Sequence, residues 1–210
     1  AMVDGLVGSE MCISDRSNGD GVTNVSHCAG LFFSHALGEI IRQGYGMAMM
    51  WDIENGYKDG QDHGMFASSK EPNVDWLNPH PSFYHYYYYN KCFGDTYYES
   101  HSTSKLIRIH TSTFSSGEIG IVAINISSEE EVLSLNIKNK NTGNIAGVFE
   151  LSGDSPSSRK VAINSTVTNK EAGGPQNFLK IKANKIEIRN NNLKLNLKPY
   201  SANYIVIEND

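Results

Sequence analysis

The stretch Tyr45-Gly46-Met47-Ala48-Met49-Met50-Trp51-Asp52 is a short apolar run that ends in an aromatic residue and a carboxylate. A helix-forming segment precedes it, and a polar, glycine-containing segment follows it. This arrangement predicts a parallel strand that is buried on both faces. Ligands of α/β proteins bind where the C-terminal ends of such strands deliver side chains. Two interpretations stay open: Trp51 and Asp52 face a substrate, or Trp51 is a core residue and Asp52 begins an ordinary loop.

The residues before this run have a helical pattern. Apolar side chains recur at three- and four-residue steps over residues 25–41, and Gly44 follows as a stop signal. Asn24 or Ser26 would cap the start of this helix. A second short apolar run that ends in a carboxylate, residues 6–10, precedes it. The order strand, helix, strand predicts a parallel crossover unit.

Residues 52–80 form a connection that is too long for a simple turn, and connections of this length are usually functional or mobile. Four of its polar residues suit contacts with a polar substrate, namely Asp52, Glu54, Asp62 and His63. The alternative for each of them is a solvated loop residue.

An aromatic helix is predicted next, over residues 82–93, introduced by two prolines. The pattern predicts that Tyr84 and Tyr88 lie to one side of this helix, and that four other aromatic residues face the core: Phe83, Tyr86, Tyr87 and Phe93. A row of tyrosines suits a binding platform. Packing onto neighbouring layers is the favoured interpretation, because aromatic residues dominate buried interfaces.

From about residue 95 the helical period disappears, and β-branched residues alternate with polar ones. Strands are predicted around residues 107–110, 122–126, 133–138, 148–151, 160–163, 179–181, 185–188, 193–197 and 204–207. Short strands joined by polar turns predict an antiparallel β-sandwich with one face of each sheet buried. Residues 152–177 are predicted to be a long loop or irregular insertion.

Composition and charge argue against several classes of partner. With 23 acidic and 18 basic residues the net charge is -5, which disfavours a nucleic-acid surface. No apolar run is long enough to span a membrane. The three cysteines, Cys12, Cys28 and Cys92, contain no C-x-x-C pair, so they indicate neither a disulfide framework nor a zinc site, and they leave the cellular compartment open. The N-terminus has no signal-like segment, and we expect the chain to begin within a fold.

The segment SNGDGVTNVSH resembles the calcium-binding loop of dockerins and EF-hands. In that alignment Arg16 takes the first loop position and His27 the twelfth. In a working site both of these positions hold residues with carboxylate ligands. Arg16 and His27 cannot supply them, so a calcium site is disfavoured. No metal site and no cofactor are predicted.

Two strands that end in carboxylates, followed by a β-sandwich, resemble the C-terminal part of a retaining clan A glycoside hydrolase. The segments GLFFSHALGEIIRQGYGMAMMWDIENG, DHGMF, PSFYHYYYYNKCFGD and LKLNLKPYSANYIVIE are similar to the agarase and porphyranase enzymes of family 86 and the xylosidase-type enzymes of family 39. The resemblance implies a fold that is α/β plus all-β. Residues 1–94 would be the last two βα units of a (β/α)8 barrel, and residues 95–210 an accessory antiparallel β-sandwich.

The resemblance also implies the site residues. Glu10, in the pair Ser9-Glu10, matches the nucleophile at the end of the seventh barrel strand, and Trp51 matches the aromatic floor of the reactive sugar subsite. The loop residues named above, Asp52, Glu54, Asp62 and His63, would contact sugar hydroxyls. Met11 departs from the pattern, because many relatives have an aromatic residue after the nucleophile.

Retaining cleavage of a glycoside needs two carboxyl groups about 5–5.5 Å apart, one as nucleophile and one as acid/base. Glu10 supplies one, and the resemblance implies that the other lies in an N-terminal barrel segment missing from this sequence. The sequence therefore predicts a fragment of a polysaccharide-degrading retaining glycoside hydrolase, inactive alone, with a carbohydrate substrate and a secreted or periplasmic location. The alternative is a non-catalytic carbohydrate-binding or interaction module.

Overall fold

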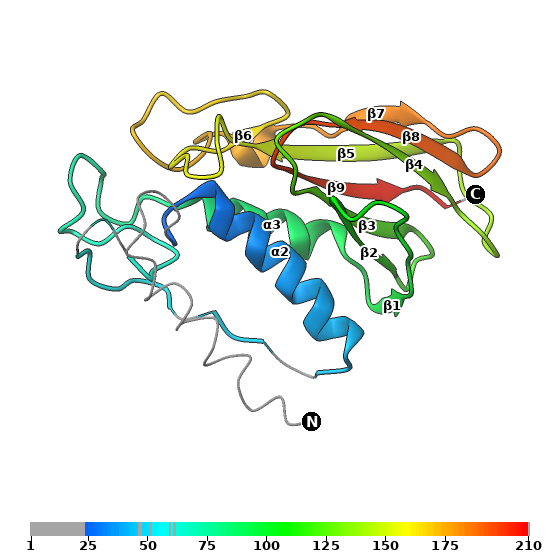
Figure 1. The fold of residues 1–210 in the computed structure, drawn as a ribbon, viewed down its shortest axis with the longest axis horizontal. Coiled ribbons are helices and arrows are strands. Elements are labelled where there is room, and N and C mark those ends of the chain that lie inside the picture. The colour runs from blue at the N-terminus through cyan, green and yellow to red at the C-terminus, as the bar shows by residue number, and fades with distance from the viewer. Residues whose placement is uncertain (1–23, 46–47, 51, 59, 61, 210) are drawn as a thin grey trace.

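The computed structural model describes residues 24–45, 48–50, 52–58, 60 and 62–209. Three layers pack on one another: a pair of helices, a seven-stranded sheet and a two-stranded sheet (Figure 1). None of the helices within the described residues has the length and apolar character needed to cross a membrane. Glu10, Trp51 and the predicted strand at residues 6–10 lie outside the described residues.

Helix α2, His27–Arg42, forms where the apolar stripe predicts a helix. Ser26 occupies the N-cap position, and the chain leaves the helix through Gly44, whose φ of 78° is a left-handed conformation that glycine adopts without strain. Helix α3, Pro81–Cys92, begins with a proline at its first helical position, where a missing N–H costs nothing. Both predicted helices are confirmed within one or two residues at each end.

The predicted core face of α3 is wrong. Tyr84, Tyr88 and Tyr89 are buried, whereas the four residues expected in the core, Phe83, Tyr86, Tyr87 and Phe93, are only half-buried. Almost every face of this helix is aromatic, so its sequence marks no single buried stripe. Helix α2, the large sheet and the ring of Phe178 cover α3 from different sides.

The seven-stranded sheet has the order β1-β2-β3-β9-β5, with β6 and β7 both paired to the outer side of β5. The small sheet pairs β4 with β8. All of these pairings are antiparallel, as the alternating pattern predicts. The strands are β1 Thr96–Tyr98, β2 Ile107–Thr113, β3 Ile119–Asn125, β4 Glu131–Asn136, β5 Ile145–Ser152, β6 Ala162–Ile163, β7 Asn184–Glu187, β8 Asn192–Leu197 and β9 Ser201–Ile207.

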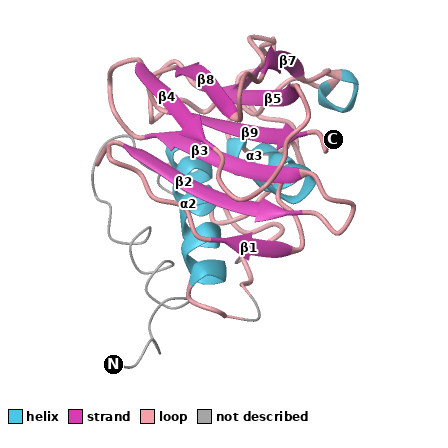
Figure 2. Cartoon of the chain, turned by 90° about the vertical axis from the view of Figure 1, so that its right-hand side faces the viewer, coloured by secondary structure: helices cyan, strands magenta, loops and turns pink. Residues whose placement is uncertain are grey.

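The large sheet is buried on both faces, which corrects the expectation of one buried face per sheet. Strand β3 has no exposed residue, and its side chains alternate between two cores. Val122 and Ile124 pack with the helices, whereas Ile121 and Ala123 pack with residues of β4 and β8. Figure 2 shows the strands in front of the two helices, which cover the far face of the large sheet.

Three local predictions differ from the structure. Strand β1 is not predicted, and residues 179–181, predicted as a strand, fall largely in the 3₁₀ helix η1, Phe178–Lys180. Residues 48–50 are not a strand, and Met49 is 71% exposed. A buried parallel strand needs hydrogen-bonded neighbours, and no strand of the described residues pairs with this segment.

The predicted division into residues 1–94 and 95–210 stays a prediction. The helices before the boundary share a core with the strands after it, in which Leu31 and Tyr88 join Ile124 and Tyr204. The predicted irregular segment at residues 152–177 is confirmed, apart from Ser152, which ends β5, and the two-residue strand β6.

Candidate functional site

The structure brings together the four predicted site residues that it describes. The backbone N–H of Asp52 donates to the carbonyl of His63 at 3.3 Å, and the N–H of Met65 donates back to the carbonyl of Asp52 at 2.8 Å. Two residues after Asp52, Glu54 forms a parallel bridge with Phe66, the residue that follows Met65. Two segments of the loop therefore run side by side and hold their polar side chains in one region.

Among these four residues, Asp52 has a side-chain oxygen that is buried without a partner in the described part of the chain. Its side chain is half-buried, and the unpartnered oxygen is Oδ1. Burial, with the negative charges of Asp62 and Glu54 added, raises the pKa of the Asp52 carboxyl above its ordinary value. A carboxylate oxygen in this condition is suited to accept a hydrogen bond from a sugar hydroxyl, since an unpaired buried acceptor is costly.

His63 is half-buried and linked to the start of α2. The side-chain amide of Asn24 donates to Nδ1 of His63 at 2.8 Å, which leaves the ring proton on Nε2. Glu54 is exposed. Both residues therefore lie on the two paired loop segments that hold Asp52, and neither is fully buried.

Asp62 serves the loop itself. Its side chain is fully buried, with Oδ1 accepting from the N–H of Gly64 at 2.8 Å and Oδ2 accepting from the N–H of Ser68 at 3.1 Å. Both carboxylate oxygens are used to fix the turn between residues 62 and 68. In this structure Asp62 therefore shapes the loop from inside and offers no exposed oxygen to a ligand.

A buried charged network lies beneath the same loop, and sequence reasoning missed it. His80 donates from Nδ1 to the carbonyl of Gly64 at 2.7 Å and from Nε2 to Oε2 of Glu71 at 2.8 Å. Both ring nitrogens of His80 therefore face hydrogen-bond acceptors. Burial alone would raise the pKa of the Glu71 carboxyl, but His80 and the Arg159 guanidinium lower it overall.

The network ties the site loop to the irregular segment 152–177. Arg159 donates to Oε1 of Glu71, and Asn78 donates to the carbonyl of Ala172 at 3.2 Å. Figure 1 shows the two loops at the same end of the molecule, in cyan and yellow. The only local signal for this network is the sequence Pro79-His80-Pro81, which marks His80 as a helix entry and gives no hint of Glu71.

The histidines at residues 27 and 85 are packed in the core. His27 donates from Nε2 to the carbonyl of Tyr200 at 2.7 Å, so its Nδ1 accepts from His85 Nε2 at 3.2 Å. His85 Nδ1 in turn accepts from the hydroxyl of Tyr204 at 2.8 Å. Burial lowers the pKa of His27 to about 4 and that of His85 well below its ordinary value. Both rings are neutral structural groups.

Two groups of described side chains have the composition of a metal site. Asp62, Glu71 and His80 are all buried, and their donor atoms already bond to one another or to the backbone. That group is accounted for as an internal network. The other group, His35, Glu39 and His110, lies between α2 and β2 and away from the site loop.

No protein-family model and no curated protein sequence matches this chain. Solved structures match it in fold. A Paenibacillus polymyxa xyloglucanase of glycoside hydrolase family 44 matches with a TM-score of 0.60 and 16% identity, over 87% of this chain and 29% of that one. A Clostridium acetobutylicum xylanase of family 30, subfamily 8, matches with a TM-score of 0.58 and 14% identity, over 87% and 39% of the two chains.

An arabinose-bound α-L-arabinofuranosidase of family 51 matches with a TM-score of 0.60 and 13% identity, over 99% of this chain and 30% of that one. At these identities the likeness is one of fold. This chain spans 29 to 39% of the length of the three structures, so its fold is one that glycoside hydrolases contain as about a third of their chain. The predicted families 86 and 39 are not among these three, and the family stays a prediction.

Proposed function

We propose that this chain is part of a polysaccharide-degrading retaining glycoside hydrolase, which cleaves O-glycosyl bonds by double displacement. The observation that carries the proposal is the likeness over nearly the whole chain. The match to the α-L-arabinofuranosidase covers 99% of this chain, so a fold like that of nearly the whole chain occurs within one glycoside hydrolase structure. A fold alone defines no activity, so the proposal also depends on named residues.

In this proposal Glu10 is the nucleophile and Trp51 forms the floor of the reactive sugar subsite. Both lie outside the described residues, and their roles depend on the sequence resemblance. Asp52, Glu54 and His63 orient sugar hydroxyls, which is supported by their grouping on one loop and by the unpartnered Oδ1 of Asp52.

The chemistry explains why the chain would be inactive alone. In double displacement a carboxylate attacks the anomeric carbon, and a second carboxyl group protonates the leaving oxygen, then activates water for the second step. Glu10 performs the first role, and we propose that the acid/base residue lies in barrel strands outside this sequence. Without general acid catalysis the reaction loses about 100- to 10,000-fold in rate.

The test measures hydrolysis of xylan, xyloglucan, agar and porphyran by this chain and by a longer protein from the same gene. We expect turnover by the longer protein only. Glu10→Gln should abolish turnover and preserve substrate binding, because the amide keeps the shape of the carboxylate and cannot attack the sugar. Glu99→Gln, at an exposed glutamate, is the matched control.

Azide rescue identifies the nucleophile directly. Azide added to the Glu10→Gly variant should give a glycosyl azide of inverted configuration, because azide takes the place of the missing carboxylate. Turnover by this chain alone that survives repurification would contradict the proposal. Rescue at Asp52 or Glu54, with none at Glu10, would assign the nucleophile to another residue.

The second candidate is a non-catalytic carbohydrate-binding module, and one exposed aromatic residue favours it. Trp76 is 62% exposed on the loop that precedes α3. Exposed indole rings are suited to stack on sugar faces, since their apolar surface is otherwise left in water. Quenching of tryptophan fluorescence by an oligosaccharide, lost in Trp76→Ala and accompanied by no turnover in the longer protein, would support this candidate.

A further inference from the structure

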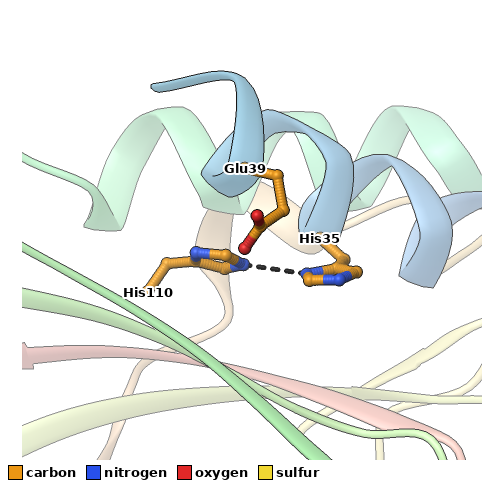
Figure 3. Close-up of side chains that lie close together, drawn as sticks. All are labelled: His35, Glu39 and His110. Atoms are coloured by element: carbon orange, nitrogen blue, oxygen red, sulfur yellow. Dashed lines mark hydrogen bonds between the residues drawn. The ribbon is translucent and has the colours of Figure 1, made fainter. Parts of the chain in front are cut away.

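Three potential metal ligands meet where helix α2 crosses strand β2 (Figure 3). His35 and Glu39 are four residues apart on α2, so they lie one above the other on the same helix face. His110 reaches them from β2. Their ligand atoms all lie within 4.8 Å of one another.

We propose that His35, Glu39 and His110 form a binding site for a divalent transition-metal ion, with Zn²⁺ as the best match to the ligands. Two histidines and one glutamate are an established zinc ligand set, and they leave a fourth position for water. The Nδ1 atom of His35 lies 3.0 Å from Nε2 of His110. A tetrahedral ion with bonds of about 2.0–2.1 Å holds neighbouring nitrogens about 3.3 Å apart, so binding needs only a small opening of this contact.

Only one carboxylate oxygen of Glu39 is bound by Arg42. Arg42 donates from Nε and Nη2 to Oε2 of Glu39, at 2.9 and 2.6 Å, and leaves Oε1 for the ion. The hydrogen bond from Arg42 also lowers the pKa of Glu39, so the carboxylate is ionised at neutral pH. The Glu39 side chain is 37% exposed, which gives an ion a path from solvent.

Gly38 allows the third ligand to reach the helix. A Cβ atom at this position would overlap the ring of His110, which lies directly against the helix backbone there. His110 itself is only 1% exposed, so its ring is held in place by packing. Two ligands from one helix turn and one from a packed strand residue give a site that needs little rearrangement when the ion binds.

The surroundings set the strength of the site. The Nδ1 atom of His110 is buried without a hydrogen-bond partner among the described residues. When Nε2 binds the ion, the ring proton must sit on Nδ1, where no described acceptor receives it. An outer-shell partner is usually worth about 10- to 100-fold in metal affinity. Arg42 and Arg108 are close enough to His35 to repel a cation. We therefore expect a dissociation constant on the order of micromolar, above that of a closed four-ligand zinc site.

The experiment titrates ZnCl₂ into the chelator-treated full chain by calorimetry. The expected result is one ion per chain in the wild type, with at least tenfold weaker binding in His35→Gln and in Glu39→Gln. His101→Gln is the matched control, because His101 is an exposed histidine on another segment, and its zinc affinity should equal that of the wild type. The variants change partly exposed residues of α2, and far-ultraviolet circular dichroism checks that the helix persists.

CoCl₂ gives a second, independent measurement. Cobalt bound by two imidazoles, a carboxylate and water is expected to produce visible absorption bands in the wild type that His35→Gln removes. The absence of saturable zinc binding in the wild type would overturn the proposal. Equal zinc affinity in the wild type and both α2 variants would also overturn it, because the ion would then be bound elsewhere.

Discussion

The side chains of Glu71 and His80 are fully buried, and Oε2 of Glu71 lies 2.8 Å from Nε2 of His80. His80 also holds the carbonyl of Gly64, and Glu71 receives Arg159 from a distant segment. These buried contacts of Glu71 and His80 therefore fix the site loop internally and attach it to the segment 152–177. Asp52 and His63 belong to this same loop.

Removing the carboxylate from this pair should destabilise the protein strongly. Glu71→Ala leaves the buried His80 ring and the partly buried Arg159 without their acceptor, and breaking a buried pair costs about 3–5 kcal/mol. Glu71→Gln should cost less, because the amide oxygen keeps one acceptor. The free energy of unfolding from urea titration measures both effects. Glu99→Ala is the exposed control and should change it by about 0.5 kcal/mol or less. A Glu71→Ala loss as small as the control's would contradict the interpretation.

The packed histidines predict how stability depends on pH. The pKa of His27 is about 4 in the fold and about 6.5 in an unfolded chain. Between these values the unfolded chain binds more protons, so the free energy of unfolding falls as the pH falls from 6.5 towards 4. Above about pH 6.5 His27 is neutral in both states, so the stability that depends on its neutral form is fully present. For His27 alone it amounts to about 3 kcal/mol, and His85 acts in the same direction.

The free energy of unfolding measured by denaturation between pH 7 and 5 reports mainly the titration of histidines, since most carboxylates remain ionised in this range. His27→Gln should flatten the curve, because Gln can donate to the carbonyl of Tyr200 and accept from His85 without titrating. His101→Gln is the exposed control. An equal slope in the wild type and His27→Gln would show that His27 does not carry the effect.

Gly30 should resist substitution by alanine although it lies inside a helix. In an ordinary exposed helix this change stabilises by about 0.8–1 kcal/mol. Here the added Cβ would overlap the ring of His85, which is fully buried and has no room to move. Overpacking of this kind costs about 1–3 kcal/mol, so the melting temperature should fall. Gly56→Ala is the control, because a Cβ there meets no atom within 4 Å. A stabilised Gly30→Ala would show that the ring of His85 can shift.

The sequence predicts structure best where one periodicity dominates. Helix α2 has a single apolar stripe, and its observed bounds match the prediction. The sequence predicts one buried face for strand β3, yet both of its faces are buried. The layers that cover them come from segments distant in the sequence. The same reason explains the wrong core face of α3, because aromatic residues surround this helix and distant segments decide which of them are buried. It also explains residues 48–50, because a buried strand needs pairing partners that a local pattern does not contain.

The site follows the same rule. The grouping of Asp52 with His63 is predictable from their place in one long polar loop. The contact between Glu71 and Arg159 is not, because 88 residues separate them and neither belongs to a recognisable motif. Asp62 shows a further limit, since sequence gives its charge but not that the backbone uses both of its oxygens.

A truncated chain tests the predicted boundary between residues 94 and 95. Removing residues 1–94 deletes α2 and α3, and so uncovers the apolar face formed by Val122, Ile124 and Phe149. It also removes the partners of the buried Tyr204 hydroxyl, which lie on the two helices. The opposite face, packed on β4 and β8, stays covered.

We therefore expect residues 95–210 alone to be much less stable than the full chain and to bind a hydrophobic dye. Each buried aliphatic or aromatic side chain left in water forfeits about 1.5–3 kcal/mol, and several are affected at once. Hydrogen exchange gives the measurement for each strand: protection of β3 and β9 amides should fall most, because these strands lose the helical layer directly. A fragment whose free energy of unfolding lies within about 1 kcal/mol of the full chain's would mean that the sheets fold independently. It would establish residues 95–210 as the separate accessory domain that the sequence predicts.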